Sequence, residues 1–541
     1  MMSKIEILPN EILFECFKYL NGFDILCSFN GLNYRFNQLI QSIPLHLDLR
    51  NVRRLIFKQF CDEILSKQSI KNQIYSLFLS NENPYNQFEL FVLLFSSSKF
   101  PQLKSLILTE IKLHDVSMFS SLSPLIYQLR SLTILDVPDD HDILLSVLQS
   151  LRSSTLPLIS RFSSLTNLTI PQCSTSSLCE LLSTIPSLNC LQVGTVYRYF
   201  QYRAGIYLNN LYKNPPKDPF PNLKHLIIKE YYDKYDGFEM MLKRTPNLTN
   251  LTIYIPDNVG DINGNKLEDL ITTSLPYLKF FKFVIEYSYY KEEIFQQFQS
   301  DFWCKQHHWY TECSISDNCG LIYTIPYMLD KYELKPHTKI SSNDSKTFQN
   351  VTDLTINFDA LAEKYQYDFS NVISLTLKSN SNSSIKHIEH LKMIINLSHL
   401  KHLNISRCKF ETQDILFELL KNASQLSSLN IHSNAFKFLF HDDELCKYLN
   451  KMITKLQVTE DFGCALDKSC DLKEFCRIFS NIEQLICRLD QADAFKFLLK
   501  NLPKLSYINV FSSKFICEDI YWMENLNLDE KIIMVKGTSI K

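Results

Sequence analysis

The hydrophobic positions of the chain recur in one pattern: an apolar residue, two variable positions, a second apolar residue, one variable position and a third apolar residue. Alternation over the last three positions is typical of a strand that buries one face. From Val372 onward the copies begin 23 to 29 residues apart. Fifteen copies begin at Ile74, Leu103, Leu132, Leu165, Leu188, Leu223, Leu248, Leu278, Val351, Val372, Leu400, Leu426, Ile453, Ile482 and Leu505.

Segments with helical periodicity lie between these strands. Several of them end at a proline, which cannot continue a helix and biases the preceding residue toward extended geometry. Each strand-plus-helix unit is too small to bury its apolar face alone, so we expect the units to stack into an α/β solenoid with a concave parallel sheet and convex helices. The clearest helices are Leu178 to Ile185, Asp414 to Ala423 and Ala492 to Leu502, and the prolines are Pro186, Pro246, Pro276 and Pro503.

The pattern and its period resemble those of leucine-rich repeats. This resemblance implies one block of repeats over residues 44–287 and a second block with a C-terminal cap over residues 348–541. Residues 288–347 interrupt the array as an aromatic-rich insert or irregular repeat with a flexible loop. A globular α/β domain built from the same elements is the alternative.

Before the repeats, residues 1–43 form a separate pattern of three short helices. Pro9 is suited to a helix start, and Asn10 is expected to cap that helix. Asn21-Gly22 ends the first helix, and Asp24 is expected to cap the second. A domain near forty residues rarely buries a sufficient core by itself, so we expect this module to leave apolar surface for a partner.

The order of residues in these helices resembles an F-box. Phe36 stands where many members of that family have tryptophan, and Cys16 replaces a usual isoleucine, but both positions remain apolar. An ordinary helical cap that buries its own leucines is the alternative. The matching segments are Leu8-Pro9-x-Glu11-Ile12-Leu13, Cys16-Phe17-x-Tyr19-Leu20, Asp24-Ile25-Leu26 and Leu32-Asn33-x-Arg35-Phe36.

The F-box resemblance implies docking on a Skp-type adaptor and, through it, on a cullin-RING ubiquitin ligase. The chain would then be a non-catalytic substrate-recognition subunit whose repeats hold an unknown target protein. Some of the docking residues would contact the adaptor and others would support them. They are Leu8, Pro9, Ile12, Leu13, Phe17, Leu20, Leu26, Leu32 and Phe36.

Target binding is expected at strand positions between the core leucines, because side chains there point away from the core. The candidates are Ile107, Thr169, Ile227, Thr252, Thr376, Asn404 and Asn430. Two rival interpretations stay open. One is a repeat protein that binds or inhibits a partner without any ligase role, and the other is an F-box protein that acts outside ubiquitination.

The insert contains two of the three tryptophans of the chain. Residues 309–313 and 321–325 are predicted as strands joined by a turn at residues 316–320, and the aromatic side chains are candidates for partner recognition. Five possible zinc ligands also lie here, but their spacing matches no known zinc site, so we predict no metal. They are Cys304, His307, His308, Cys313 and Cys319.

Composition narrows the function further. With 56 basic and 58 acidic residues, the chain has no charge excess that favours nucleic acid or membrane surfaces. Phosphate-binding loops and nucleophile-elbow or metalloprotease motifs are absent from the sequence, so we predict neither enzyme activity nor a cofactor. Sixteen scattered cysteines, and an N-terminus without a secretory pattern, favour the cytoplasm or the nucleus.

Overall fold

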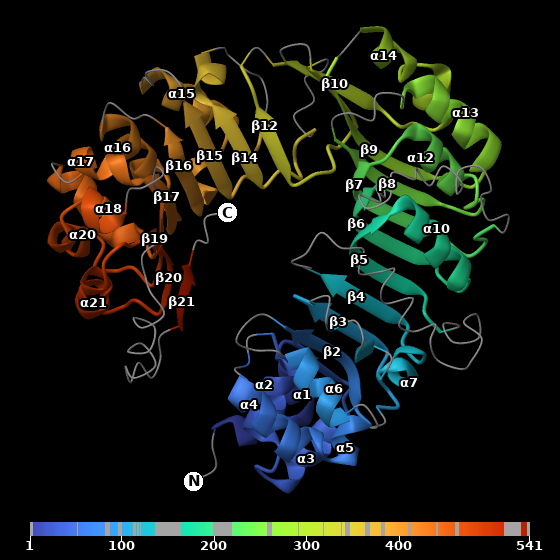
Figure 1. Cartoon of the computed structure of the whole chain (residues 1–541), viewed down its shortest axis with the longest axis horizontal. Helices are drawn as coiled ribbons and strands as arrows, with labels where there is room; N and C mark the ends of the chain where they lie inside the picture. The colour runs from blue at the N-terminus through green and yellow to red at the C-terminus, as the bar shows by residue number, and fades with distance from the viewer. Residues whose placement is uncertain are drawn as a thin grey trace. The chain divides into compact units, whose positions relative to one another are not determined.

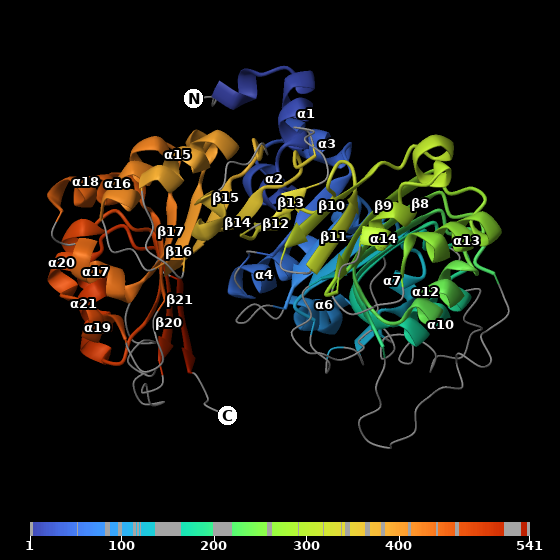
Figure 2. The same cartoon turned by 90° about the horizontal axis from the view of Figure 1, so that it is seen from above.

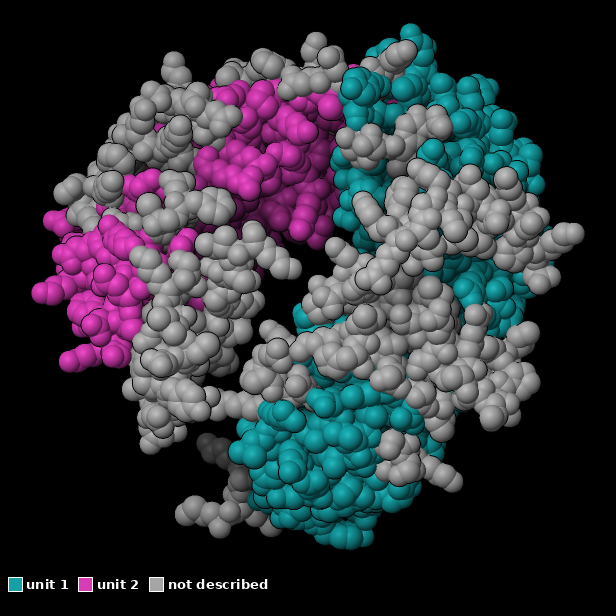
Figure 3. Space-filling model, in the orientation of Figure 1, with its two compact units in different colours: residues 1–309 teal, residues 310–541 magenta. Residues whose placement is uncertain are grey.

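The computed structural model divides into two compact units, Met1–Trp309 and Tyr310–Lys541, which Figure 3 colours separately. The boundary falls inside the segment expected as an insert. The structure describes residues 4–537 apart from 51, 53, 82–86, 96–99, 112–114, 116–117, 120, 136–163, 199–218, 257–261, 290–291, 317–318, 337, 341–346, 363–367, 380–384, 409–412, 440–441, 460–464 and 513–531. Each unit is an α/β arrangement built on a largely parallel sheet.

In the first unit, nine of the described strands pair in chain order, and every neighbouring pair is parallel. Short strands with alternating burial account for this architecture, because each strand buries one face beside the same residues of its neighbour. The strands are β1 (Leu45–Asp48), β2 (Ile74–Ser80), β3 (Ser105–Thr109), β4 (Ser131–Leu135), β5 (Asn167–Ser174), β6 (Cys190–Tyr197), β7 (His225–Tyr232), β8 (Asn250–Ile255) and β9 (Phe280–Tyr287).

Helices cover one face of these strands, as Figures 1 and 2 show for α10, α12 and α13 over β5 to β9. We call the other face of each sheet its open face. The helical segments of the first unit are η1 (Lys4–Ile7), α1 (Asn10–Lys18), α2 (Gly22–Phe29), α3 (Tyr34–Gln41), α4 (Arg54–Phe60), η2 (Cys61–Leu65), α5 (Gln68–Lys71), α6 (Gln87–Phe95), α7 (Ser123–Ile126), α10 (Thr175–Thr184), α12 (Tyr235–Leu242), α13 (Gly264–Ser274), α14 (Glu292–Gln297) and η4 (Phe302–Gln306).

The repeats stack in register through their second apolar residue. One expected copy is wrong: the sequence suggested Leu132, Leu135 and Val137, but Leu132 pairs with Leu106 and takes the second position instead. Two overlapping patterns three residues apart caused the error, and the buried set is Leu129, Leu132 and Ile134. The aligned row is Leu77, Leu106, Leu132, Leu168, Leu191, Leu226, Leu251 and Phe281.

The second unit holds a nine-stranded sheet that begins with β12 and runs from β14 to β21. Its neighbouring strands are parallel, and in Figure 1 helices α15, α16 and α18 lie on the outer side of β14 to β18. The strands are β12 (Lys331–Leu334), β14 (Asp353–Asn357), β15 (Ser374–Ser379), β16 (His402–Cys408), β17 (Ser428–His432), β18 (Lys455–Thr459), β19 (Gln484–Arg488), β20 (Tyr507–Ser512) and β21 (Ile532–Gly537).

The helices of the second unit match the expected ones at their centres. The segments expected over residues 414–423 and 492–502 correspond to α16 and α21. The helical segments are η5 (Phe358–Ala362), α15 (Ile385–Ile394), η6 (Leu397–His399), α16 (Gln413–Asn422), η7 (Ser433–Ala435), α17 (Phe436–Leu439), α18 (Asp443–Met452), α19 (Leu466–Ser469), α20 (Leu472–Ile478) and α21 (Ala492–Asn501).

Between the two blocks, the expected hairpin is confirmed: β10 (Thr311–Ser316) pairs antiparallel with β11 (Cys319–Thr324), and β13 (Lys339–Ile340) joins β10. The sequence reading missed two repeat strands, β12 and β21. In β21, Ile533 and Val535 pair with Ile508 and Val510, the core positions of the preceding repeat. In β12, Tyr332 and Leu334 pair with Leu354 and Ile356, the core positions of the next repeat. A tyrosine at the second apolar position concealed this copy.

Candidate functional site

The N-terminal module, which we define as residues 4–41, packs three helices around a small aromatic core. Phe29 of α2 lies 5.3 Å from Phe17 of α1 and 5.2 Å from Phe36 of α3, measured between ring centroids. Phe36 is fully buried and Phe17 is 5% exposed. Phe36 therefore closes the core of the module.

The helix caps differ from those expected. Pro9 precedes α1 without a side-chain cap, and the Asn10 side chain instead accepts a hydrogen bond from Nε of Arg35 at 2.8 Å. Asn21 caps α2 by accepting from the Phe23 amide, whereas Asp24 lies within the first turn. A carboxylate there still interacts favourably with the N-terminal end of the helix dipole.

Arg35 fixes the segment that precedes α1. Its guanidinium donates to the Glu6 carbonyl at 2.7 Å and also to the Leu8 carbonyl. Asn33, the cap of α3, donates to the Glu6 carboxylate at 2.9 Å. The start of α3 thus holds residues 6–10 in place by charge-assisted hydrogen bonds, which are stronger than neutral ones.

The module is joined closely to the first repeat strand. The Asn21 side chain accepts from the Asp48 amide at 2.9 Å and donates to the Asp48 carbonyl. A Cβ on Gly22 would lie 2.7 Å from the His46 carbonyl oxygen, so only glycine permits this approach of α2 to β1. Phe23 packs edge-on against Phe60 of α4 at 4.8 Å.

The expected docking residues differ in their exposure to solvent. Leu13, Phe17, Leu26 and Phe36 are buried and support the module from inside. Leu8 is half-buried, and Pro9 is exposed. Ile12, Leu20 and Leu32 are 47%, 43% and 53% exposed, so they are available to a partner.

The sequence reading did not single out four further exposed apolar side chains. Ile5, Ile7, Tyr19 and Tyr34 are 36%, 73%, 86% and 79% exposed. Tyr19 lies seven residues after Ile12, with the exposed Cys16 between them, so these side chains share one side of α1. The i, i+4, i+7 spacing was the signal that could have revealed this stripe, and it lies beside the buried stripe of Leu13 and Phe17.

The expected target-binding residues all lie on the open faces, in two separate sets. Each is half-buried and stands between two buried core residues of its strand. In the first unit they are Ile107, Thr169, Ile227 and Thr252, and in the second they are Thr376, Asn404 and Asn430.

The two tryptophans of the expected insert are buried. Trp303 is fully buried and Trp309 is 7% exposed. Trp303 lies 5.0 Å from Phe298 and 5.8 Å from Phe283 between ring centroids, so it packs onto the core beside β9. The two tryptophans therefore close the core of the first unit beside its ninth strand and offer no surface to a partner. Partner recognition by the exposed Tyr289 and Tyr310 of the insert stays a prediction.

The possible zinc ligands of the insert are not gathered into one site among the described residues. His307 stacks on Trp309 at 4.1 Å, and burial lowers its pKa. No three potential metal ligands gather among the described residues. Within those residues no helix is long and apolar enough to cross a bilayer.

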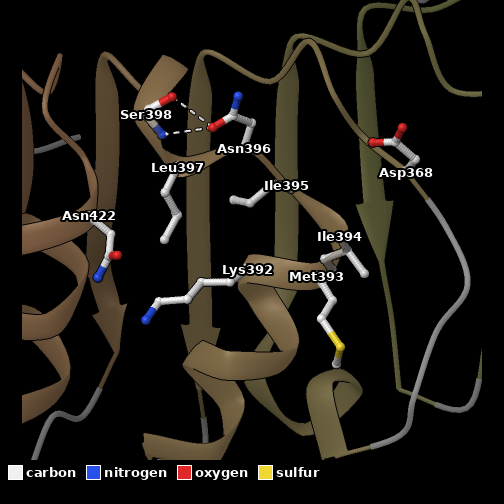
Figure 4. A pocket seen from close by; sticks show the side chains of 9 residues that line it. All are labelled: Asp368, Lys392, Met393, Ile394, Ile395, Asn396, Leu397, Ser398 and Asn422. Carbon is white, nitrogen blue, oxygen red and sulfur yellow. Dashed lines mark hydrogen bonds between the residues drawn. The ribbon is translucent and has the colours of Figure 1, made fainter.

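A pocket of about 480 Å³ opens beside the end of α15 (Figure 4). Nζ of Lys392 lies 2.9 Å from Glu389 and 3.0 Å from Glu418, so its charge is balanced. Asn396 accepts hydrogen bonds from the amide and hydroxyl of Ser398. The lining offers no paired nucleophile and base, and it consists of Asp368, Lys392, Met393, Ile394, Ile395, Asn396, Leu397, Ser398 and Asn422.

Comparison with known proteins does not identify a family for this chain. No family model matches the chain, and no curated protein matches it. Among solved structures, the chain is similar to one of a Rad7 and Elc1 complex from yeast, with 13% identity, a TM-score of 0.26, and coverage of 85% of this chain and 86% of that chain. Values this low leave the function to be argued from the residues of the chain itself.

Proposed function

We propose that the chain is a non-catalytic substrate-recognition subunit of a ubiquitin ligase. The N-terminal module docks a Skp-type adaptor in the manner of an F-box, and the repeats hold a target protein. The chain then acts by proximity, because it positions lysines of the target near an activated ubiquitin that other subunits supply. This role places the protein in the cytoplasm or the nucleus.

One observation supports docking above all. The module has a closed aromatic core, yet seven large apolar side chains remain exposed on residues 5–34. So many exposed apolar side chains within thirty residues are what a docking surface for a partner requires. The set is Ile5, Ile7, Ile12, Tyr19, Leu20, Leu32 and Tyr34.

The test uses the full chain and a purified Skp-type adaptor, with affinity measured by calorimetry. Ile12→Asp combined with Leu20→Asp should weaken binding at least about tenfold, because both side chains are exposed and each would place an unpaired charge in the interface. The thermal unfolding temperature should stay within about 2 °C of the wild type, because exposed substitutions have small effects on stability.

A matched control changes two apolar side chains of similar exposure in the repeats. Tyr277→Asp with Phe280→Asp, 58% and 60% exposed, should leave adaptor affinity unchanged. Equal adaptor binding by the wild type and the Ile12/Leu20 variant would refute docking through this surface. If the adaptor binds but no cullin co-purifies, the rival of an F-box protein acting outside ubiquitination is favoured instead.

A further inference from the structure

The open face of the second unit carries a row of amide side chains across three neighbouring strands. The strand register pairs Asn404 of β16 with Asn430 of β17, and Asn430 with Gln457 of β18. We call these three residues the amide row. Asn404 and Asn430 are half-buried and Gln457 is exposed. Because neighbouring strands lie about 4.8 Å apart, the row spans about 10 Å, the length of three extended residues.

Positive charge flanks this row at two side chains. Lys455 precedes Gln457 on β18, and Arg407 follows Asn404 on β16. The sequences of these three strands contain no aspartate or glutamate. Lys455 and Arg407 are exposed, and neither makes an ion pair with another described residue.

The amide row has hydrogen-bonding capacity that the described protein leaves unused. A carboxamide offers an N–H donor and a C=O acceptor, the same pair that a peptide unit presents. The Asn430 side-chain oxygen is buried without a hydrogen-bond partner among the described residues. The same holds for Asn509 of β20, which the register places in the same row beyond Ile486 and which is only 8% exposed.

A buried acceptor without a donor destabilises the folded protein, because it has lost its hydrogen bonds to water and gained none in return. Rotation about the terminal torsion of asparagine is soft, so Asn430 can turn its oxygen toward an incoming N–H. The N–H groups of an extended polypeptide laid across β16 to β18 would meet this need. The Asn404 oxygen already accepts from the Ser406 amide and hydroxyl, so Asn404 offers its NH2 group to a ligand carbonyl. These strands carry no Phe, Tyr or Trp, so they lack the large aromatic rings on which the bases of single-stranded nucleic acids stack.

We propose that the open face of β16 to β18 binds an extended, acidic polypeptide segment. Asn404, Asn430 and Gln457 pair with its backbone, and Lys455 and Arg407 receive its carboxylate side chains. The inference rests on the proposed function in one respect, because it specifies how the repeats hold a target. Adaptor docking resides on the N-terminal module and is measured separately, so either claim can fail while the other stands.

The experiment selects random twelve-residue peptides displayed on phage against the full-length protein. The peptides enriched by the wild type should be rich in Asp and Glu. The triple variant Asn404→Ala, Asn430→Ala, Gln457→Ala should bind a synthetic copy of the most enriched peptide at least about tenfold more weakly, because three hydrogen bonds are lost. N-methylation of alternate backbone nitrogens in that peptide should weaken its binding to the wild type by a similar factor.

Two further variants separate recognition from folding. Asn167→Ala, Gln192→Ala, Asn250→Ala removes three amides from the first unit and should leave peptide affinity unchanged. Lys455→Glu with Arg407→Glu alters only exposed side chains, so it should fold normally, lose the acidic peptides and select basic ones. Unfolding curves of all variants identify any loss of binding that comes from a loss of fold.

Three outcomes would overturn the proposal. They are the absence of any peptide enriched by the wild type, equal binding by the wild type and the amide-row variant, and insensitivity to backbone methylation. Tight binding of a twenty-nucleotide single-stranded RNA, lost in the Lys455/Arg407 variant while peptides fail to bind, would assign the face to nucleic acid. In each case the adaptor measurement shows whether the proposed docking of the module still holds.

Discussion

The N-terminal module and the repeats differ in how many of their large apolar side chains are exposed. Among the described residues, nineteen large apolar side chains are exposed; seven of them lie in residues 5–34 and only three in the whole second unit. Within each repeat block, an interior strand has a neighbouring strand on both sides, so its leucines are buried by stacking. The module has too few residues to cover its own surface. Exposed apolar side chains are therefore concentrated on the surface that we propose for docking.

The strongest test of this difference compares two residues of α3 that are two positions apart. Phe36→Ala should destabilise the module by about 3–5 kcal/mol, because it removes a fully buried ring that packs on Phe29. Tyr34→Ala, at 79% exposure, should change the free energy of unfolding by less than about 0.5 kcal/mol. Hydrogen exchange over residues 10–41 measures both. Similar protection in the two variants would show that the module has no closed core.

Removal of a core side chain from one repeat should destabilise only that repeat and its neighbours. Trp303→Ala should cost about 3 kcal/mol or more and should raise hydrogen exchange in β9 and η4. Because each repeat contacts mainly its neighbours, exchange in α1 to α3 and adaptor affinity should stay at wild-type values. Loss of adaptor binding in this variant would contradict the separation of the two regions.

The junction between the regions can be tested through Gly22. Gly22→Ala should destabilise the first unit by about 1–3 kcal/mol, because the new methyl group meets the His46 carbonyl oxygen and Leu47 Cδ2 at 2.7 and 2.9 Å. Urea unfolding gives the free energy, and exchange should rise at both α2 and β1. Ser28→Ala at an exposed site of the same helix is the control. An unchanged Gly22→Ala protein would mean that α2 does not approach β1 this closely.

The smallest expected effect is a pH dependence confined to the repeats. Burial lowers the pKa of His307, His387 and His402, and Lys455 and Lys401 add to the effect at His402. The unfolded chain therefore binds protons first as the pH falls through about 6.5, so the free energy of unfolding falls from there toward the lowered folded values. Residues 1–43 contain no histidine, so module protection should not change. Calorimetry and hydrogen exchange at pH 7.5 and pH 5.5 measure this, and greater stability at pH 5.5 would contradict it.

The repeat strands could be read from the sequence because their period and their apolar register coincide. That reading failed where two patterns overlap, at Leu132, and where tyrosine replaces leucine, at Tyr332. The division of Ile12 and Leu13 into exposed and buried residues could not be predicted, because adjacent apolar positions on a helix look equivalent until its packing partner is known. Likewise, the composition of the insert did not show that Trp303 and Trp309 would be buried in a core, because tryptophan is also common at sites that bind a partner.

The hydrogen bonds between Asn21 and Asp48 limit how far the N-terminal module can move relative to β1. Together with the close contact of Gly22 and His46, they hold α2 directly against β1, so no flexible linker separates the module from the first strand. A partner seated on the module is then held at a set angle and distance from β1, whereas a flexible linker would let it sample a volume. In the proposed function, this junction would act as a rigid spacer. Its stiffness would then determine which lysines of the bound target protein come near the activated ubiquitin.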